Sequence, residues 1–197
     1  MVETFLRVPR DTGEVVADAI RLLGLISGVL AGVTLGPLLL GVFGLVAIGL
    51  VVPRFLGVRP ALDIATSIVL LVAAWANALD LYVLTPAIDI PVHLLLNGLI
   101  AALAVVLFQR VGVLPALPPR ALVLVTVAIG FMAGVLWEVG EWAGNRFLDP
   151  SIFVAYDDTI GDLVVGGLGA LVAGLAMPWV TADSRWQGAR QTAPSFR

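Results

Sequence analysis

The longest uncharged stretch of the chain sets its fold class. No residue from Leu22 to Val52 is charged, and similar apolar runs recur along nearly the whole length. A helix needs about 20 apolar residues to cross a hydrocarbon core of about 30 Å, whereas roughly 31 residues would give a helix of about 46 Å. Gly36-Pro37 lies near the middle of the run, and proline interrupts a helix by removing a hydrogen bond. We therefore predict two short spans, at 18–35 and 37–52.

Proline- and glycine-rich clusters separate four further apolar runs, which predict spans at 61–83, 91–109, 120–143 and 158–180. Charged residues make up 13% of the chain, against about 25% in soluble domains, and the mean hydropathy is +1.05. We therefore predict an all-α polytopic transmembrane helix bundle with six spans.

The spans form one predicted transmembrane domain, 18–180, between an N-terminal segment, 1–17, and a polar tail, 181–197, which is expected to be disordered. The N-terminal segment contains both charge signs and no apolar stretch followed by a cleavage site, so we expect the first span to direct insertion.

Arginine placement predicts the orientation. All 11 basic residues are arginine, and six spans leave only Arg146 on one side of the membrane. The other ten are Arg7, Arg10, Arg21, Arg54, Arg59, Arg110, Arg120, Arg185, Arg190 and Arg197. Short cytoplasmic loops accumulate positive charge, so both termini are predicted to be cytoplasmic.

The opposite side gathers carboxylates. Eight acidic residues are predicted there, together with Arg146 and the only histidine, His93. They are Asp80, Asp89, Glu138, Glu141, Asp149, Asp157, Asp158 and Asp162. Two potential cations cannot neutralise eight acids, so the group must be protonated, hydrated or bridged by a bound cation.

Helical spacing predicts that many of these side chains point inward. Gly130 and Gly134 continue at helical spacing into Glu138 and Glu141, and small residues mark faces that pack closely on neighbours. Three other spans show comparable polar stripes. The last span has Asp158, Asp162, Gly166, Ala170 and Gly174, the fourth has Asp89, His93, Asn97 and Ala101 at and after its start, and the third has Asn77 and Asp80. Four helices are therefore predicted to share a polar pocket at one depth.

Carboxylates and an imidazole form a donor set that suits a divalent metal such as Zn, Mn, Fe or Mg. We predict a metal site made of His93, Glu138, Glu141, Asp158 and Asp162, open to the extracytoplasmic side. Glu138 and Glu141 are the candidate catalytic residues, because a carboxylate beside a metal-bound water acts as a general base. Asn77, Asp80, Asp89 and Asn97 are the candidate supporting polar residues.

Other functions stay open. The acids could relay protons or bind a cation in a small transporter, or the pocket could be structural in an accessory subunit. His93 could make only an interhelical hydrogen bond, and Asp89 and Asp157 could be solvated caps. We expect the tryptophans near span ends to anchor the protein at the interface: Trp75, Trp137, Trp142 and Trp179. The glycines of 158–180 are expected to serve packing.

Several chemistries are excluded or disfavoured. The chain has no cysteine, and it lacks the HExxH, G-x-S-x-G and Walker motifs. "DDTIGD" contains D-x-x-x-D, which some transferases use to hold magnesium diphosphate, but their companion motifs are missing. No basic patch for nucleic acid exists. The expected partners are the lipid bilayer and an envelope or lipid-linked small molecule, while catalysis and oligomeric state stay undetermined.

Three motifs resemble bacterial inner-membrane proteins of the YjdF type. They are "IDIPVHLLLNGL", "LWEVGEW" and "YDDTIGDLVVGGLGA", which appear in the family's order within about residues 75–175. The resemblance implies a multi-pass protein of the bacterial cytoplasmic membrane. It also implies shared polar positions at Asp89, His93, Glu138, Glu141, Asp158 and Asp162. The family has no established activity. The chain departs from the family's pattern at the additional Asp157 and in the first two spans. The chain also shows a looser similarity to VanZ-like proteins.

Overall fold

The computed structural model describes residues 2–181, which are almost entirely helical and contain no strand. In chain order the elements are α1 (Val2–Phe5), α2 (Thr12–Leu35), α3 (Pro37–Leu56), α4 (Pro60–Ala78), α5 (Leu81–Leu84), η1 (Pro86–Ile88), α6 (Asp89–Arg110), α7 (Pro119–Phe147) and α8 (Tyr156–Thr181). Six of the helical segments, 19 to 29 residues long, are long and apolar enough to cross a membrane. The prediction of an all-α bundle with six spans is confirmed.

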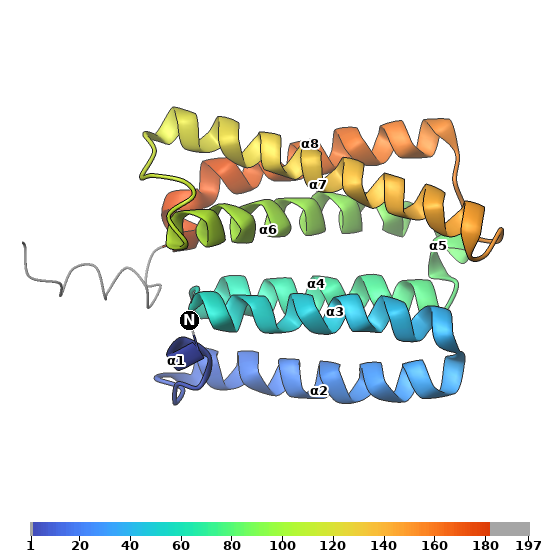
Figure 1. Ribbon diagram of the computed structural model, residues 1–197, viewed down its shortest axis with the longest axis horizontal. Helices are drawn as coiled ribbons and strands as arrows, with labels where there is room; N and C mark the ends of the chain where they lie inside the picture. Colours follow the sequence, from blue (N-terminus) through green and yellow to red (C-terminus); the bar gives the residue numbers. More distant parts are fainter. Residues whose placement is uncertain (1, 182–197) are drawn as a thin grey trace, which may run out of the picture.

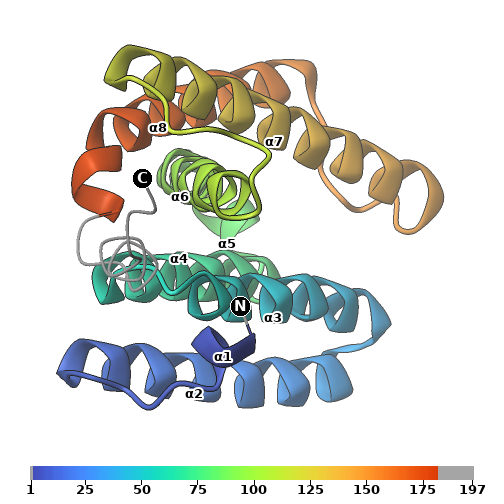
Figure 2. The ribbon, with the colours of Figure 1, turned by 60° about the vertical axis from the view of Figure 1, so that its left-hand side comes forward.

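The six long helices run side by side in two groups (Figures 1 and 2): α2, α3 and α4 form one, and α6, α7 and α8 form the other. Helix α6 joins the groups, because it contacts α3 and α4 as well as α7 and α8. Figure 1 shows the α2–α3 turn, α5 and the α7–α8 connection at one end of the bundle, and α1 and the last turn of α8 at the other. The predicted orientation places that second end in the cytoplasm.

The break at Gly36-Pro37 lies where the sequence predicts it. Gly36 has a φ of 108°, a conformation that side-chain-bearing residues rarely adopt, and Pro37 is the first residue of α3. Proline is favoured at the first helical position because its missing N–H has no intrahelical acceptor there. One apolar run therefore folds into the antiparallel pair α2 and α3.

Other boundaries differ from the prediction. Helix α2 begins at Thr12, six residues before the predicted start, because the Asp11 side chain accepts a hydrogen bond from Glu14 N at 2.9 Å and caps the helix. Helix α4 ends at Ala78 and not at residue 83, and Asp80 follows it with a positive φ of 54°. The turn at Asp80 redirects the chain into α5. Residues 182–197 of the predicted tail lie outside the described residues.

Charge pairs hold the first group of helices together. Arg21 of α2 donates to both carboxylate oxygens of Asp63 on α4, at 2.6 and 2.7 Å, and to the Leu50 carbonyl of α3 at 2.8 Å. Asp18 accepts from Arg21 and from Arg54 of α3. Arg21 and Asp63 are buried, so each compensates a charge that would be costly alone. Some of the arginines that predict the orientation also join helices.

Two arginines attach the N-terminal segment to the same end of the bundle. Arg54 donates to the backbone carbonyls of Phe5 and Arg7, and Arg110 of α6 donates to the Thr4 hydroxyl at 2.8 Å. The ring of Phe5 stacks on that of Phe55 at 4.3 Å between centroids. The beginning of the described chain is therefore packed against α3 and α6.

The tryptophans divide into two kinds. Trp137, Trp142 and Trp179 are about half exposed near the ends of α7 and α8, as interfacial anchors would be. Trp75 is partly buried and packs edge-on against Phe43 of α3, with ring centroids 5.3 Å apart. Trp75 therefore packs between helices, because its position on α4 faces α3.

Candidate functional site

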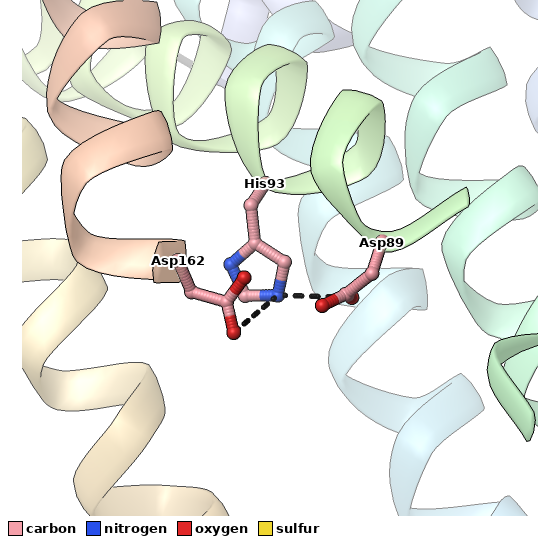
Figure 3. A group of neighbouring side chains, drawn as sticks. All are labelled: Asp89, His93 and Asp162. Atoms are coloured by element: carbon pink, nitrogen blue, oxygen red, sulfur yellow. Dashed lines mark ion pairs between the residues drawn. The ribbon is translucent and has the colours of Figure 1, made fainter. Parts of the chain in front are cut away.

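Three side chains from two helices meet near one end of the second group of helices (Figure 3). Asp89 is the first residue of α6, His93 follows one turn later, and Asp162 lies in the second turn of α8. His93 Nε2 lies 3.4 Å from Asp89 Oδ1 and 3.9 Å from Asp162 Oδ2. One potential ligand atom from each residue lies within 4.8 Å of the other two. We call these three residues the triad.

Burial differs across the triad. The side chains of His93 and Asp162 are 12% and 9% exposed, whereas that of Asp89 is 26% exposed. The triad is therefore open on the Asp89 side and enclosed by helices on the other.

Backbone contact between α6 and α8 fixes the relative height of the triad's members. A Cβ atom at Gly169 would collide with the carbonyl group of Leu94, and one at Gly98 would lie 2.6 Å from the Gly169 carbonyl oxygen. Small residues allow this approach, which is how helices gain contact area in a bilayer. Because the contact leaves little freedom to slide, His93 and Asp162 are held at one level.

Asn97 lies one turn inward from His93. Its side chain fills the space that a Cβ atom at Gly166 would need, and its Nδ2 would lie 3.5 Å from a Cβ atom at Gly134. One further turn inward, Gly130 packs against Ala101 and Ala170, and both alanines are fully buried. The predicted stripes of α6, α7 and α8 thus pack together, and the polar region gives way to an apolar interface below Asn97.

The glutamates of α7 lie around the triad. Glu138 Oε1 is buried and has no hydrogen-bond partner among residues 2–181. Glu141 Oε1 accepts a hydrogen bond from Trp137 Nε1 on its own helix at 2.9 Å. Glu138 interacts electrostatically with Asp162, and Glu141 with His93 and Asp162. Neither glutamate is among the residues whose potential ligand atoms meet within 4.8 Å.

A family model for predicted membrane proteins, DUF2238, matches residues 17–183. The chain belongs to this family, the YjdF type. The match spans all six long helices and agrees with the resemblance of the three motifs. No curated protein and no solved structure matches the chain significantly. The similarity to VanZ-like proteins stays a prediction. Family membership and the six apolar helices together identify this DUF2238 protein as a multi-pass membrane protein.

The remaining acids of α8 lie farther out. Asp158 is partly buried and interacts electrostatically with Asp89 and His93. Asp157 is exposed, as a solvated residue at a helix start would be. Asp158 is not one of the three grouped residues. The sequence analysis predicted Asp158 as a metal ligand and Asp89 as a supporting residue, whereas in this DUF2238 protein it is Asp89 that lies with His93 and Asp162.

Polar residues at the span ends and in the connections have structural roles or lie apart from the triad. Asn77 and Asp80 are exposed at and beyond the end of α4, and neither is among the grouped residues. Asp149 accepts hydrogen bonds from the Ser151 hydroxyl and backbone N–H at 2.7 and 2.9 Å, which lower the pKa of its carboxyl. Asn145 donates to the Ile152 carbonyl at 2.7 Å and fixes the α7–α8 connection.

Tyr82 is a neighbour of the site that the sequence analysis missed. It lies on α5, and its hydroxyl donates to the Ala73 carbonyl at 3.3 Å. Burial, with smaller contributions from the charges of Asp89 and Glu141, raises the pKa of Tyr82 to about 12. The available signal was a polar-tipped aromatic residue in the connection that precedes Asp89.

Proposed function

We propose that this DUF2238 protein binds a divalent metal, such as Zn, Mn, Fe or Mg, through Asp89, His93 and Asp162. We further propose that it catalyses metal-dependent hydrolysis or group transfer on an envelope or lipid-linked substrate at the bacterial cytoplasmic membrane. The observation that supports this is the approach of three ligand atoms to within 4.8 Å of one another from separate turns of two helices.

The spacing suits a small metal ion. Bonds of about 2.1 Å in a tetrahedral site place neighbouring ligand atoms roughly 3.4 Å apart. The separation between His93 Nε2 and Asp89 Oδ1 is 3.4 Å, and that between His93 Nε2 and Asp162 Oδ2 is 3.9 Å. The first matches, and the second needs a contraction of about 0.5 Å. The ligand atoms of Asp89 and Asp162 lie within 4.8 Å of each other, so this third pair needs a contraction of at most about 1.4 Å. Three protein ligands are typical of catalytic sites, which keep one position for water or substrate.

The proposed roles follow from position. His93 and Asp162 would hold the metal from its enclosed side, and Asp89 from its open side. A metal in such a site supplies a hydroxide nucleophile at neutral pH and polarises the bond that is attacked. Glu138 and Glu141 are the proposed general bases, because their carboxylates lie around the triad from a third helix.

An apolar, exposed surface of α7 beside the site supports a lipid-linked substrate. Helix α7 brings Glu138 and Glu141 to the site, and its neighbouring side chains are exposed: Leu136 is 64%, Val139 53% and Trp142 53% exposed. Such apolar side chains lie against acyl chains in a membrane. A lipid could therefore present its headgroup to the triad while its chains stay in the bilayer.

The alternatives receive less support. A transporter needs polar groups beyond the site, but Asn97 is followed on its stripe by Ala101, which packs with Gly130 and Ala170. A structural or accessory subunit would need the triad only for packing. That alternative predicts loss of folded protein when a triad residue is replaced, which the following experiment measures.

The test is metal binding by the purified protein. We expect close to one divalent metal per chain in elemental analysis of wild type prepared without chelator. His93→Ala and Asp162→Asn should lower the affinity at least about 100-fold while the variants stay folded. Asp157→Asn is the matched control, since Asp157 is exposed on the same helix end. A metal-free wild type, or a His93→Ala variant with unchanged affinity, would contradict the proposal.

The reaction is tested separately from the metal. We expect Glu138→Gln to abolish turnover and to leave expression and metal content near wild type. Mass spectrometry of envelope lipids from cells that express wild type or Glu138→Gln would detect an accumulating lipid-linked substrate. Identical lipid profiles would argue against lipid-linked chemistry, even if the metal were present.

A further inference from the structure

Two polar groups on the inner side of the triad make no hydrogen bond with the part of the chain that the structure describes, and one of them, Glu138 Oε1, is fully buried. Asn97 is only 7% exposed, yet its carboxamide makes no hydrogen bond with any residue between 2 and 181. Glu138 Oε1 is likewise buried and unpaired. Buried polar groups are almost always hydrogen-bonded, and leaving one unpaired costs roughly 1–3 kcal/mol. Both groups are therefore suited to a ligand that residues 2–181 do not supply.

Both groups lie close to the triad along their helices. Asn97 follows His93 by one turn on α6, and its amide nitrogen lies between Gly134 of α7 and Gly166 of α8. Glu138 lies one turn outward from Gly134 and interacts electrostatically with Asp162. Asn97 therefore lies on the inner side of His93, away from Asp89, and Glu138 approaches Asp162 from a third helix.

Their chemistry is complementary to a single water molecule. A carboxylate accepts hydrogen bonds, and a carboxamide N–H donates one. A water molecule bound to a metal at the triad would donate a hydrogen bond to Glu138 and accept one from Asn97 Nδ2. The Asn97 side chain is itself held in place, because it packs directly against Gly166 of α8.

We propose that Asn97 is a positioning residue, which with Glu138 holds the metal-bound water on the enclosed side of the triad. This inference rests on the proposed function, since it requires a metal at the triad. The hydrogen bond that Asn97 donates strengthens as the water becomes hydroxide, so it favours the nucleophilic form. Asn97 is held in place by the packing of three helices, and from that position it would stabilise the hydroxide form of the metal-bound water.

The experiment uses the full chain loaded with Co²⁺, whose visible spectrum changes when its bound water ionises. We expect Asn97→Ala to bind Co²⁺ within about threefold of wild type and to raise the pH midpoint of the spectral change by about one unit. Thr126→Ala is the matched control: Thr126 is fully buried at the α7–α8 interface, but its hydroxyl already donates to the Leu122 carbonyl. Its midpoint should equal that of wild type.

The outcomes separate the two proposals. If wild type takes up no Co²⁺, the proposed function fails and this inference fails with it. If wild type and Asn97→Ala both bind Co²⁺ with the same midpoint, only the role of Asn97 is overturned. Asn97→Asp, which keeps the shape and removes the donor, should also raise the midpoint. Loss of folded protein in both Asn97 variants would assign the carboxamide to packing and would overturn the inference.

Discussion

A methyl group at Gly169 should separate α6 from α8 and so test what holds the site together. The Cβ atom of Gly169→Ala would collide with the Leu94 carbonyl oxygen, and it would lie 2.7 Å from the carbonyl carbon and 3.1 Å from Cα of that residue. These are backbone atoms, so no side-chain rotation relieves the overlap, and the helices must move apart.

The magnitude follows from two opposing effects. Overpacking costs about 1–3 kcal/mol. The cost for Gly169→Ala should lie at the upper end of this range, because the overlapping atoms of Leu94 belong to the backbone and cannot rotate away. Replacing a helical glycine by alanine returns about 1 kcal/mol, which leaves a net loss of about 2 kcal/mol. At Gly161, on the same helix, a Cβ atom meets nothing within 4 Å, so Gly161→Ala should gain about 1 kcal/mol. The two variants should differ by about 3 kcal/mol.

Thermal unfolding of both variants in the same detergent measures this difference. Using the relation for soluble chains of this length, 3 kcal/mol corresponds to roughly 6–12 °C in Tm. Metal affinity is a second measurement, because separating the helices would move Asp162 away from His93 and weaken binding in Gly169→Ala. Equal melting temperatures for Gly169→Ala and Gly161→Ala would refute the reasoning that backbone contact fixes α6 against α8.

Two further predictions concern charged and phenolic groups. Arg21→Met should destabilise the fold by about 3–5 kcal/mol, because it leaves Asp63 buried and unpaired. Combining Arg21→Met with Asp63→Leu should recover most of this loss, because neither charge then remains buried. Chemical unfolding in detergent would measure both effects, with Arg120→Met at an exposed position as the neutral control. Because the pKa of Tyr82 rises from 10.0 to about 12, its stabilising contribution is complete below about pH 10 and is lost as the pH rises through about 12. The tyrosinate absorbance of wild type minus Tyr82→Phe should therefore stay small at about pH 11, and a full tyrosinate signal there would contradict the assigned environment.

The sequence determined the features that depend on local physics. Six spans follow from the length and polarity of each run, and the break at Gly36-Pro37 follows from backbone constraints of two residues. The stripes that begin at Asp89, at Asp158 and at Gly130 follow from helical periodicity, and they do pack on one another. Each of these inferences needs only residues within one element, so a single sequence contains the necessary information.

Other features required contacts between elements. The end of α4 could not be located from hydropathy, because the chain stays apolar through Leu84 and only the turn at Asp80 ends the helix. The pairing of Arg21 with Asp63 joins residues 42 positions apart. The sequence analysis used Arg21 only as one of the arginines that predict the membrane orientation, and could not predict its partner. Tyr82 lies near the site only because α5 folds back against α4, where the Tyr82 hydroxyl donates to the Ala73 carbonyl.

The identity of the grouped residues shows this division most clearly. The sequence by itself determined that acids and a histidine lie at one membrane face, since periodicity and span count fix depth and face within each helix. Only the tertiary structure decided that Asp89, His93 and Asp162 meet within 4.8 Å while Glu138, Glu141 and Asp158 lie outside that group. The reason is physical: distances between helices depend on where their backbones touch, as at Gly169 and Leu94, and that contact is a property of two helices and not of either one.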